Sequence, residues 1–349
     1  MTLPELWFVL IAVLWAGYFV LEGFDFGVGM LLAGLSRDEV DRRVVLNTIG
    51  PVWDGNEVWV LVAGGATFAA FPDWYASLFS GFYLPLLLVL VALIVRGVAF
   101  EYRGKVDSAS WRRRWDLCIV WGSLLPSVLW GVAFANLVRG VPMTAEGEFD
   151  GSLLGLLNPY ALLGGLTTCT LFLLHGALFL ALRTTGGVRE RAHRAAAALG
   201  PVAAALAVAF LGWTQALRGS AATLALAAVA AAALVAGLVA QRARREGWAF
   251  ALTAVTLVAA VATLFVALFP DVMPSSTDPA GTLSIAGAAS SGYTLEVMTR
   301  VAAFGTPLVL LYQGWTYWVF RRRIGRGSIP APVALPAQRR PETAPEQVG

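Results

Sequence analysis

The stretch that decides the fold is Leu84–Phe100, LPLLLVLVALIVRGVAF, in which Arg96 is the only charged residue. About 18 or more predominantly apolar residues suffice to cross a bilayer as a helix. With its flanks, the segment 75–101 exceeds that length. The sequence therefore predicts a membrane-spanning helix here, with one positive charge inside the apolar layer.

The whole composition agrees with this reading. Of 349 residues, 58% are hydrophobic and 13% are charged, whereas soluble domains carry about 45–50% apolar and about 25% charged residues. A soluble globular enzyme, a fibrous chain and a disordered chain are thereby excluded. Nine apolar segments are long enough to span a membrane: 5–34, 51–71, 75–101, 114–138, 158–182, 195–217, 220–240, 247–269 and 296–320. We expect an all-α polytopic membrane protein, with a nine-span domain over 1–324.

The remaining C-terminal segment, 325–349, is rich in Pro, Ala, Arg and Glu, and we expect it to be a disordered cytoplasmic tail. The first span lacks the basic start and the small-residue cleavage site of a secretory signal. It is therefore expected to be retained as a membrane helix.

Basic residues predict the orientation of the helices. Most of the 25 Lys and Arg residues lie in or beside alternate connections, at 35–50, 102–113, 183–194, 241–246 and after 320. The opposite connections carry only Arg139 and Arg218. By the positive-inside rule, the N-terminus is outside and the C-terminus is cytoplasmic. The net charge of +3 thus reflects loops facing anionic lipid headgroups and gives no reason to expect a nucleic-acid partner.

Ionisable residues inside spans are costly and indicate functional sites. Glu22 and Asp25 fall in the inner half of the first span, and Asp54 and Glu57 in the first turns of the second. Arg96 lies near the cytoplasmic end of the third span, so all five can share one layer. Each acidic pair has i,i+3 spacing, which places its two members on one helix face.

These acids admit two interpretations. In one, Arg96 neutralises a single carboxylate, and Asp54 and Glu57 are helix-start residues near the interface. In the other, some of the carboxyls are uncharged and hold protons inside the membrane, as a proton relay requires. Four acids beside one arginine favour the second interpretation.

Other candidate residues indicate structural roles. A six-coordinate membrane haem commonly takes His/His or His/Met ligands, and the chain has two histidines, His175 and His193. We expect His175 to be structural or hydrogen-bonded, and any redox metal to be held by another chain. No metal site is expected here, and Cys118 and Cys169 are expected to be buried packing residues. Near the outer surface, Glu296 and Arg300 are expected to form an i,i+4 ion pair.

Several short motifs, in order along residues 5–320, together resemble subunit II of the cytochrome bd quinol oxidases. They are Gly23–Gly29 (GFDFGVG), Trp53–Trp59 (WDGNEVW), Ser80–Tyr83 (SGFY), Arg96–Arg103 (RGVAFEYR), Gly131–Phe134 (GVAF), Leu157–Pro159 (LNP) and Val272–Ser276 (VMPSS). The resemblance implies two four-helix bundles plus one peripheral helix. It also implies a haem-bearing partner, subunit I, and often a small single-span subunit.

The implied complex oxidises quinol, reduces O2 to water and takes protons from the cytoplasm without pumping them. Haems b558, b595 and d would belong to the partner, and this chain would bind none of them, although a bound quinone is compatible with the family. The resemblance assigns Asp54 to the start of a proton path. It assigns Trp53 to haem assembly or a quinone, and Asp25 and Arg96 to the same polar layer.

The alternative function is an independent proton- or ion-coupled transporter, since buried carboxylates serve transporters too. The oxidase interpretation requires that the chain purify together with a haem-containing partner.

Overall fold

The computed structural model describes residues 1–330, which form eleven α-helices and one small two-stranded sheet. Eight of these helices are long and apolar enough to cross a membrane. They are α1 Leu3–Leu35, α5 Tyr83–Tyr102, α6 Ala109–Arg139, α7 Pro159–Arg183, α8 Gly186–Arg218, α9 Ala221–Arg242, α10 Glu246–Leu268 and α11 Gly292–Val319. The chain is thus an all-α, multi-pass membrane protein, as predicted.

Three shorter helices complete the set: α2 Glu39–Ile49, α3 Trp53–Ala70 and α4 Pro72–Gly81. The second predicted span corresponds to α3, whose polar first turns keep its average hydropathy low. The sequence did not predict α2. It is an amphipathic helix capped by Asp38, whose side chain accepts from the Asp41 amide, and it buries Val44, Val45 and Ile49.

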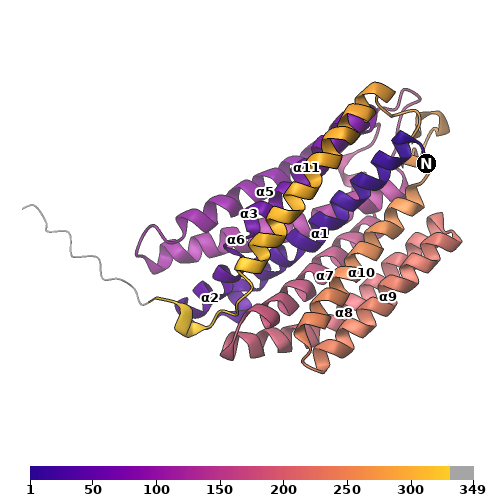
Figure 1. Ribbon diagram of the computed structural model, residues 1–349. Helices are drawn as coiled ribbons and strands as arrows, with labels where there is room; N and C mark the ends of the chain where they lie inside the picture. The colour runs from indigo at the N-terminus through magenta and orange to yellow at the C-terminus, as the bar shows by residue number, and fades with distance from the viewer. Residues whose placement is uncertain (331–349) are drawn as a thin grey trace, which may run out of the picture.

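The long helices lie side by side around α1 (Figure 1). Helices α3, α5 and α6 gather on one side of α1, and α7, α8, α9 and α10 on the other. Helix α11 runs along the outside, against α1 and α3. Consequently α1 and α6 are well enclosed, whereas α11 is nearly unburied.

The third predicted span, 75–101, is wrong in its first part. The chain forms two helices there, α4 and α5, with Phe82 between them at φ −105° and ψ 20°. Pro85 explains the break, because proline has no N–H with which to donate to the carbonyl four residues earlier, at Gly81.

Polar segments connect the helices at both ends. At the end that holds the N-terminus, strands β1 Asp271–Met273 and β2 Leu283–Ser284 pair antiparallel after α10. Short 3-10 turns occur at Leu153–Leu156, Pro279–Gly281 and Arg326–Ser328. The last of these belongs to the predicted tail, 325–349, and packs near α2, where Arg326 pairs with Asp38 and Asp41. Residues 331–349 of that tail lie outside the described residues.

Candidate functional site

The first half of the site is the stretch Glu22–Gly29 of α1, which is buried without interruption. Both acids, Glu22 and Asp25, have no exposed surface. Gly27 makes this burial possible, because its backbone lies directly against Phe172 and Gly176 of α7, where a side chain would collide. Small residues allow such close approach of membrane helices, so α1 and α7 enclose the acids tightly.

Arg96 of α5 supplies the one positive charge in this layer. Its side chain is fully buried, donates to Glu22 and lies 3.5 Å from an oxygen of Glu57. Its guanidinium carbon lies 4.8 Å from the ring centre of Phe26 and 5.2 Å from that of Phe100. These rings add cation–π attraction to a guanidinium that has no exposed surface. Arg96 therefore lies between Glu22 and Glu57, two of the four acids expected in this layer.

Asp25 is held by a different group of residues. Asn56 Nδ2 donates to Asp25 Oδ2 over 2.6 Å. The Asn56 carbonyl oxygen accepts from the Tyr317 hydroxyl over 2.8 Å and from the Gln313 amide over 3.1 Å. A hydrogen-bonded chain thus runs from Tyr317 on α11, through Asn56 on α3, to Asp25 on α1.

Sequence reasoning did not single out Asn56 or Gln313, although Asn56 stands inside the quoted motif WDGNEVW. Tyr317 stands between Trp315 and Trp318 in the sequence. The two tryptophans are exposed, whereas the hydroxyl of Tyr317 turns inward to Asn56. The sequence signal for Asn56 is its side-chain amide, which stands in an apolar helix between the carboxyls of Asp54 and Glu57.

The structure does not bring Asp54 and Trp53 into contact with the buried acids. Asp54 is exposed on α3 and accepts a hydrogen bond from the Gly55 amide over 2.8 Å. Trp53 is half-buried, with its ring 5.0 Å from that of Phe100, which in turn covers Arg96. Asp54 therefore lies on the outside of the same helix that presents Asn56 inward.

The other polar candidates have structural partners. His175 is fully buried, shares a 2.8 Å hydrogen bond with Thr253 and stacks on Phe250, as expected. Glu246 lies 3.0 Å from His193. Glu296 and Arg300 form the predicted ion pair.

Metal and cysteine chemistry find little support here. Within residues 1–330, no group of three or more His, Cys, Asp or Glu side chains is arranged to hold a metal ion. Cys169 is buried as expected, whereas Cys118 is only partly buried, and both are free thiols.

Next to the site, the C-terminal end of α5 and the N-terminal ends of α6 and α2 are joined by an ion network. Arg103 donates to Asp116 over 2.5 Å and to both oxygens of Glu39 over 2.8 and 2.9 Å. Partial burial by itself would raise the pKa of the Glu39 carboxyl, but the hydrogen bonds and charge of Arg103 outweigh it and hold that pKa below its ordinary value. This network is a fixed structural contact between ionised groups.

The buried layer has the opposite character. Three carboxyls, those of Glu22, Asp25 and Glu57, surround one guanidinium, and the second oxygens of Glu22 and Asp25 have no hydrogen-bond partner among the described residues. A buried net charge is strongly unfavourable. The cluster is neutral when two of its three carboxyls hold protons.

Comparison with known proteins gives concordant matches. A model of the family described as cytochrome bd terminal oxidase subunit II matches residues 3–320. The chain is 44% identical to cytochrome bd ubiquinol oxidase subunit 2 of Bacillus subtilis over 328 residues, which cover 93% of this chain and 97% of that protein. It is 36% identical to cytochrome bd-I ubiquinol oxidase subunit 2 of Escherichia coli over 363 residues, covering 93% and 96%.

The fold also has a solved counterpart. A chain in the structure of bd oxidase from Geobacillus thermodenitrificans superposes with a TM-score of 0.74 at 18% identity, covering 92% of this chain and 99% of that one. At that identity the likeness concerns the fold.

Proposed function

Since this chain belongs to the cytochrome bd terminal oxidase subunit II family, it is a subunit of a quinol:oxygen oxidoreductase, and we propose that its buried acids deliver cytoplasmic protons for oxygen reduction. Its family implies a partner, subunit I, which carries the haems. Reduction of O2 to water consumes protons, and a haem buried in a membrane needs a polar route that brings them. A subunit that is free of redox centres can supply part of that route.

The observation that carries this proposal is the excess of buried carboxyls over buried positive charge. Glu22, Asp25 and Arg96 have no exposed surface, so their charges are far more costly than surface charges. A purely structural ion pair would need one acid for one arginine. The additional acids are explained if they exchange protons.

We propose two connected parts of the route. Asp54, exposed near the start of α3, accepts protons, and Glu57 one turn further on is 22% exposed and lies 3.5 Å from Arg96. Glu57 thereby links the surface to Glu22. Asp25 joins the same layer through Asn56, and its free oxygen, Oδ1, is available to a proton donor or acceptor.

We further propose that α3 is the ninth membrane span. It has 18 residues and packs along α1 and α11, both of which are candidate spans. Its polar first turns then lie at the cytoplasmic side, together with the basic connections. The N-terminus is outside and the C-terminus inside in this arrangement.

The nine spans then divide as the family pattern suggests. Helices α1, α3, α5 and α6 form one four-helix bundle, α7 to α10 form the second, and α11 is peripheral. The packing of these elements supports the division.

The remaining assignments follow from the family. We propose that subunit I holds haems b558, b595 and d, that quinol and O2 react there, and that a small single-span subunit completes some complexes. Trp53, beside Phe100, is proposed, together with Arg96, to support haem assembly or to lie near a quinone. No redox step is assigned to a residue of this chain.

The test uses the assembled oxidase with single substitutions. We expect Asp54→Asn and Asp25→Asn each to lower quinol-driven oxygen consumption by about tenfold or more, since an amide cannot carry a proton. Glu296→Gln, in the exposed pair with Arg300, is the matched control and should leave turnover unchanged.

Haem content, read from the visible spectrum, must be normal in each variant, because loss of haem would imitate loss of proton delivery. Near-normal turnover in a fully haem-loaded Asp54→Asn complex would remove Asp54 from the route, and the same result for Asp25→Asn would remove Asp25.

A further inference from the structure

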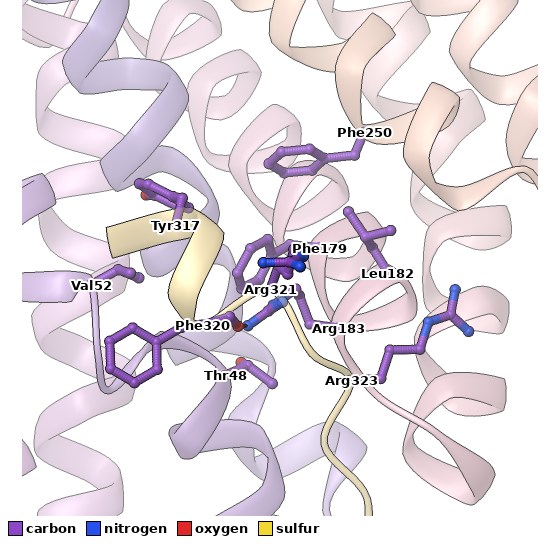
Figure 2. Close-up of a pocket in the computed structure, with 10 residues that line it drawn as sticks. All are labelled: Thr48, Val52, Phe179, Leu182, Arg183, Phe250, Tyr317, Phe320, Arg321 and Arg323. Atoms are coloured by element: carbon purple, nitrogen blue, oxygen red, sulfur yellow. Dashed lines mark hydrogen bonds between the residues drawn. The ribbon is translucent and has the colours of Figure 1, made fainter. Parts of the chain in front are cut away.

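A cavity of about 350 Å³ opens at the cytoplasmic end of the molecule, between α11 and the ends of α7 and α10. Figure 2 shows its lining. Its size lies at the lower end of the range for ligand pockets, roughly 300–1,000 Å³. The lining residues are Thr48, Val52, Phe179, Leu182, Arg183, Phe250, Tyr317, Phe320, Arg321 and Arg323.

Three arginines give this cavity a strong positive charge. Among residues 1–330, Arg183 and Arg321 form no salt bridge, and Arg323 reaches Glu246 at 3.4 Å, a carboxylate that Arg189 and His193 also contact. Arg183 donates to the Phe320 carbonyl, and Arg321 donates to the Trp318 carbonyl over 2.6 Å. Arg183 is partly buried, whereas Arg321 and Arg323 are exposed at the mouth of the cavity. A partly buried guanidinium without a countercharge is unfavourable, so an anion beside Arg183, within reach of Arg321, would be stabilising.

Apart from Thr48 and Tyr317, the rest of the lining is apolar. Phe179, Phe250 and Leu182 form the inner wall, and Phe320, 46% exposed, lies at the edge. In Figure 2 the guanidinium groups of Arg183 and Arg321 lie between these rings, and Phe250 and Tyr317 stand above them. A small inorganic anion would satisfy the arginines but would leave this aromatic wall without a partner.

The depth of the cavity matches the lipid headgroup region. Exposed Trp315 and Trp318 flank it on α11, and such aromatic belts mark the membrane–water interface. Basic pockets between membrane helices on the cytoplasmic side suit anionic lipid headgroups. Arginine also binds phosphate in a bidentate manner, which lysine cannot do.

We propose that this cavity binds one acidic phospholipid, with its phosphate between Arg183 and Arg321 and its acyl chains along Phe179, Phe250 and Phe320. The lipid joins α11 to the rest of the protein. This helix is barely buried on its own, yet it provides Gln313 and Tyr317 to the Asn56–Asp25 chain. An acidic phospholipid therefore holds the outer helix against the inner one.

The experiment measures thermal unfolding of the purified, delipidated oxidase complex after addition of vesicles. Phosphatidylglycerol vesicles should raise the unfolding temperature by several degrees, and phosphatidylcholine vesicles should not. Arg183→Gln/Arg321→Gln should abolish the shift. Arg321→Gln alone should reduce it, and this change removes no hydrogen bond between helices. Arg322→Gln is the matched control, because Arg322 is exposed, is next in sequence and does not line the cavity.

Three outcomes would overturn the proposal. The first is that phosphatidylglycerol raises the unfolding temperature of the double variant as much as that of the native complex. The second is that inorganic phosphate alone raises the unfolding temperature of the native complex by the same amount, which would indicate a soluble anion. The third is a phosphatidylglycerol shift seen only when the chain ends after Pro330, which would mean that the C-terminal segment fills the cavity instead.

Discussion

Helices α1 and α3 each carry two acids three positions apart, but they bury these acids very differently. Glu22 and Asp25 of α1 have no exposed surface, whereas Asp54 of α3 is exposed and the Glu57 side chain is 22% exposed. The reason is the position of each helix. Helix α1 is enclosed by neighbours around its stretch 22–29, whereas α3 lies at the edge of its group.

The buried residues of α3 show how that edge position works. They are Asn56, Ala63, Thr67 and Ala70, which form one narrow stripe at helical spacing. Asp54 precedes Asn56 by two residues and therefore points roughly to the opposite side, since each residue turns the helix by about 100°. The i,i+3 spacing thus fixes the relative orientation of the two acids on each helix. The neighbouring helices determine how deeply each acid is buried.

The largest expected effect comes from removing the positive charge next to α1. Arg96→Leu leaves Glu22 buried without its countercharge, and breaking such a pair costs about 3–5 kcal/mol. We expect most of the assembled, haem-loaded complex to be lost from membranes, as measured by its visible absorbance. Glu22→Leu/Arg96→Leu should restore part of it.

Glu57→Gln serves as the comparison on α3 and should leave assembly nearly unchanged, because Glu57 is partly exposed. Native amounts of Arg96→Leu complex would mean that this pair does not hold the layer together.

A smaller effect is expected from the glycines of the same two helices. A Cβ at Gly27 of α1 would collide with the backbone of Phe172 and Gly176, while one at Gly64 of α3 would meet nothing within 4 Å. Gly27→Ala should therefore destabilise the protein by about 1–3 kcal/mol through overpacking. Gly64→Ala should be neutral or stabilising by up to about 1 kcal/mol.

Thermal unfolding of both purified glycine variants checks this prediction. Equal unfolding temperatures would contradict the close contact between α1 and α7.

The contact between the buried stripe of α3 and helix α11 can be tested at Tyr317, which lies on α11. Tyr317→Phe removes the hydroxyl that donates to Asn56 and should cost about 1 kcal/mol, the net contribution of one hydrogen bond. Tyr312→Phe is the control, since Tyr312 is 67% exposed. If both variants unfold at the native temperature, the hydrogen bond to Asn56 contributes no stability.

The smallest effect on stability is expected for Glu39, an acid outside the membrane-spanning helices. Glu39 has a pKa held below its ordinary value in the folded protein, so its contribution is present above the unfolded-state pKa and is lost as the pH falls through the folded-state pKa. Its side chain is 36% exposed, which limits this contribution to about 0.5 kcal/mol.

Glu39→Gln should therefore lower the unfolding temperature slightly at neutral pH and converge with the native protein in acid. A difference that persists unchanged at low pH would show that charge is not its cause.

Much of this protein could be predicted from its sequence. The eight strongly apolar helices were identified with ends within a few residues for most of them, because hydrocarbon thickness sets their length and apolarity. The sequence also indicated that Glu22, Glu57 and Arg96 can share one layer, since intramembrane charges are few and attract each other, and the structure brings these three side chains together. The break at Phe82 and the amphipathic α2 were missed, because local proline chemistry and a short helix give weak signals in an apolar window.

By itself, the sequence determined the class of protein, the residues that carry its charge and the spacing of its acids, because these follow from hydrophobicity and helix periodicity alone. Only the tertiary structure decided which acids are sealed from solvent. It also made Asn56 the partner of Asp25 and Tyr317 the partner of Asn56, and it left Asp54 facing outward. Those outcomes depend on where each helix lies among its neighbours, and the contacts that place α1 at the centre and α3 at the edge join residues far apart in the chain.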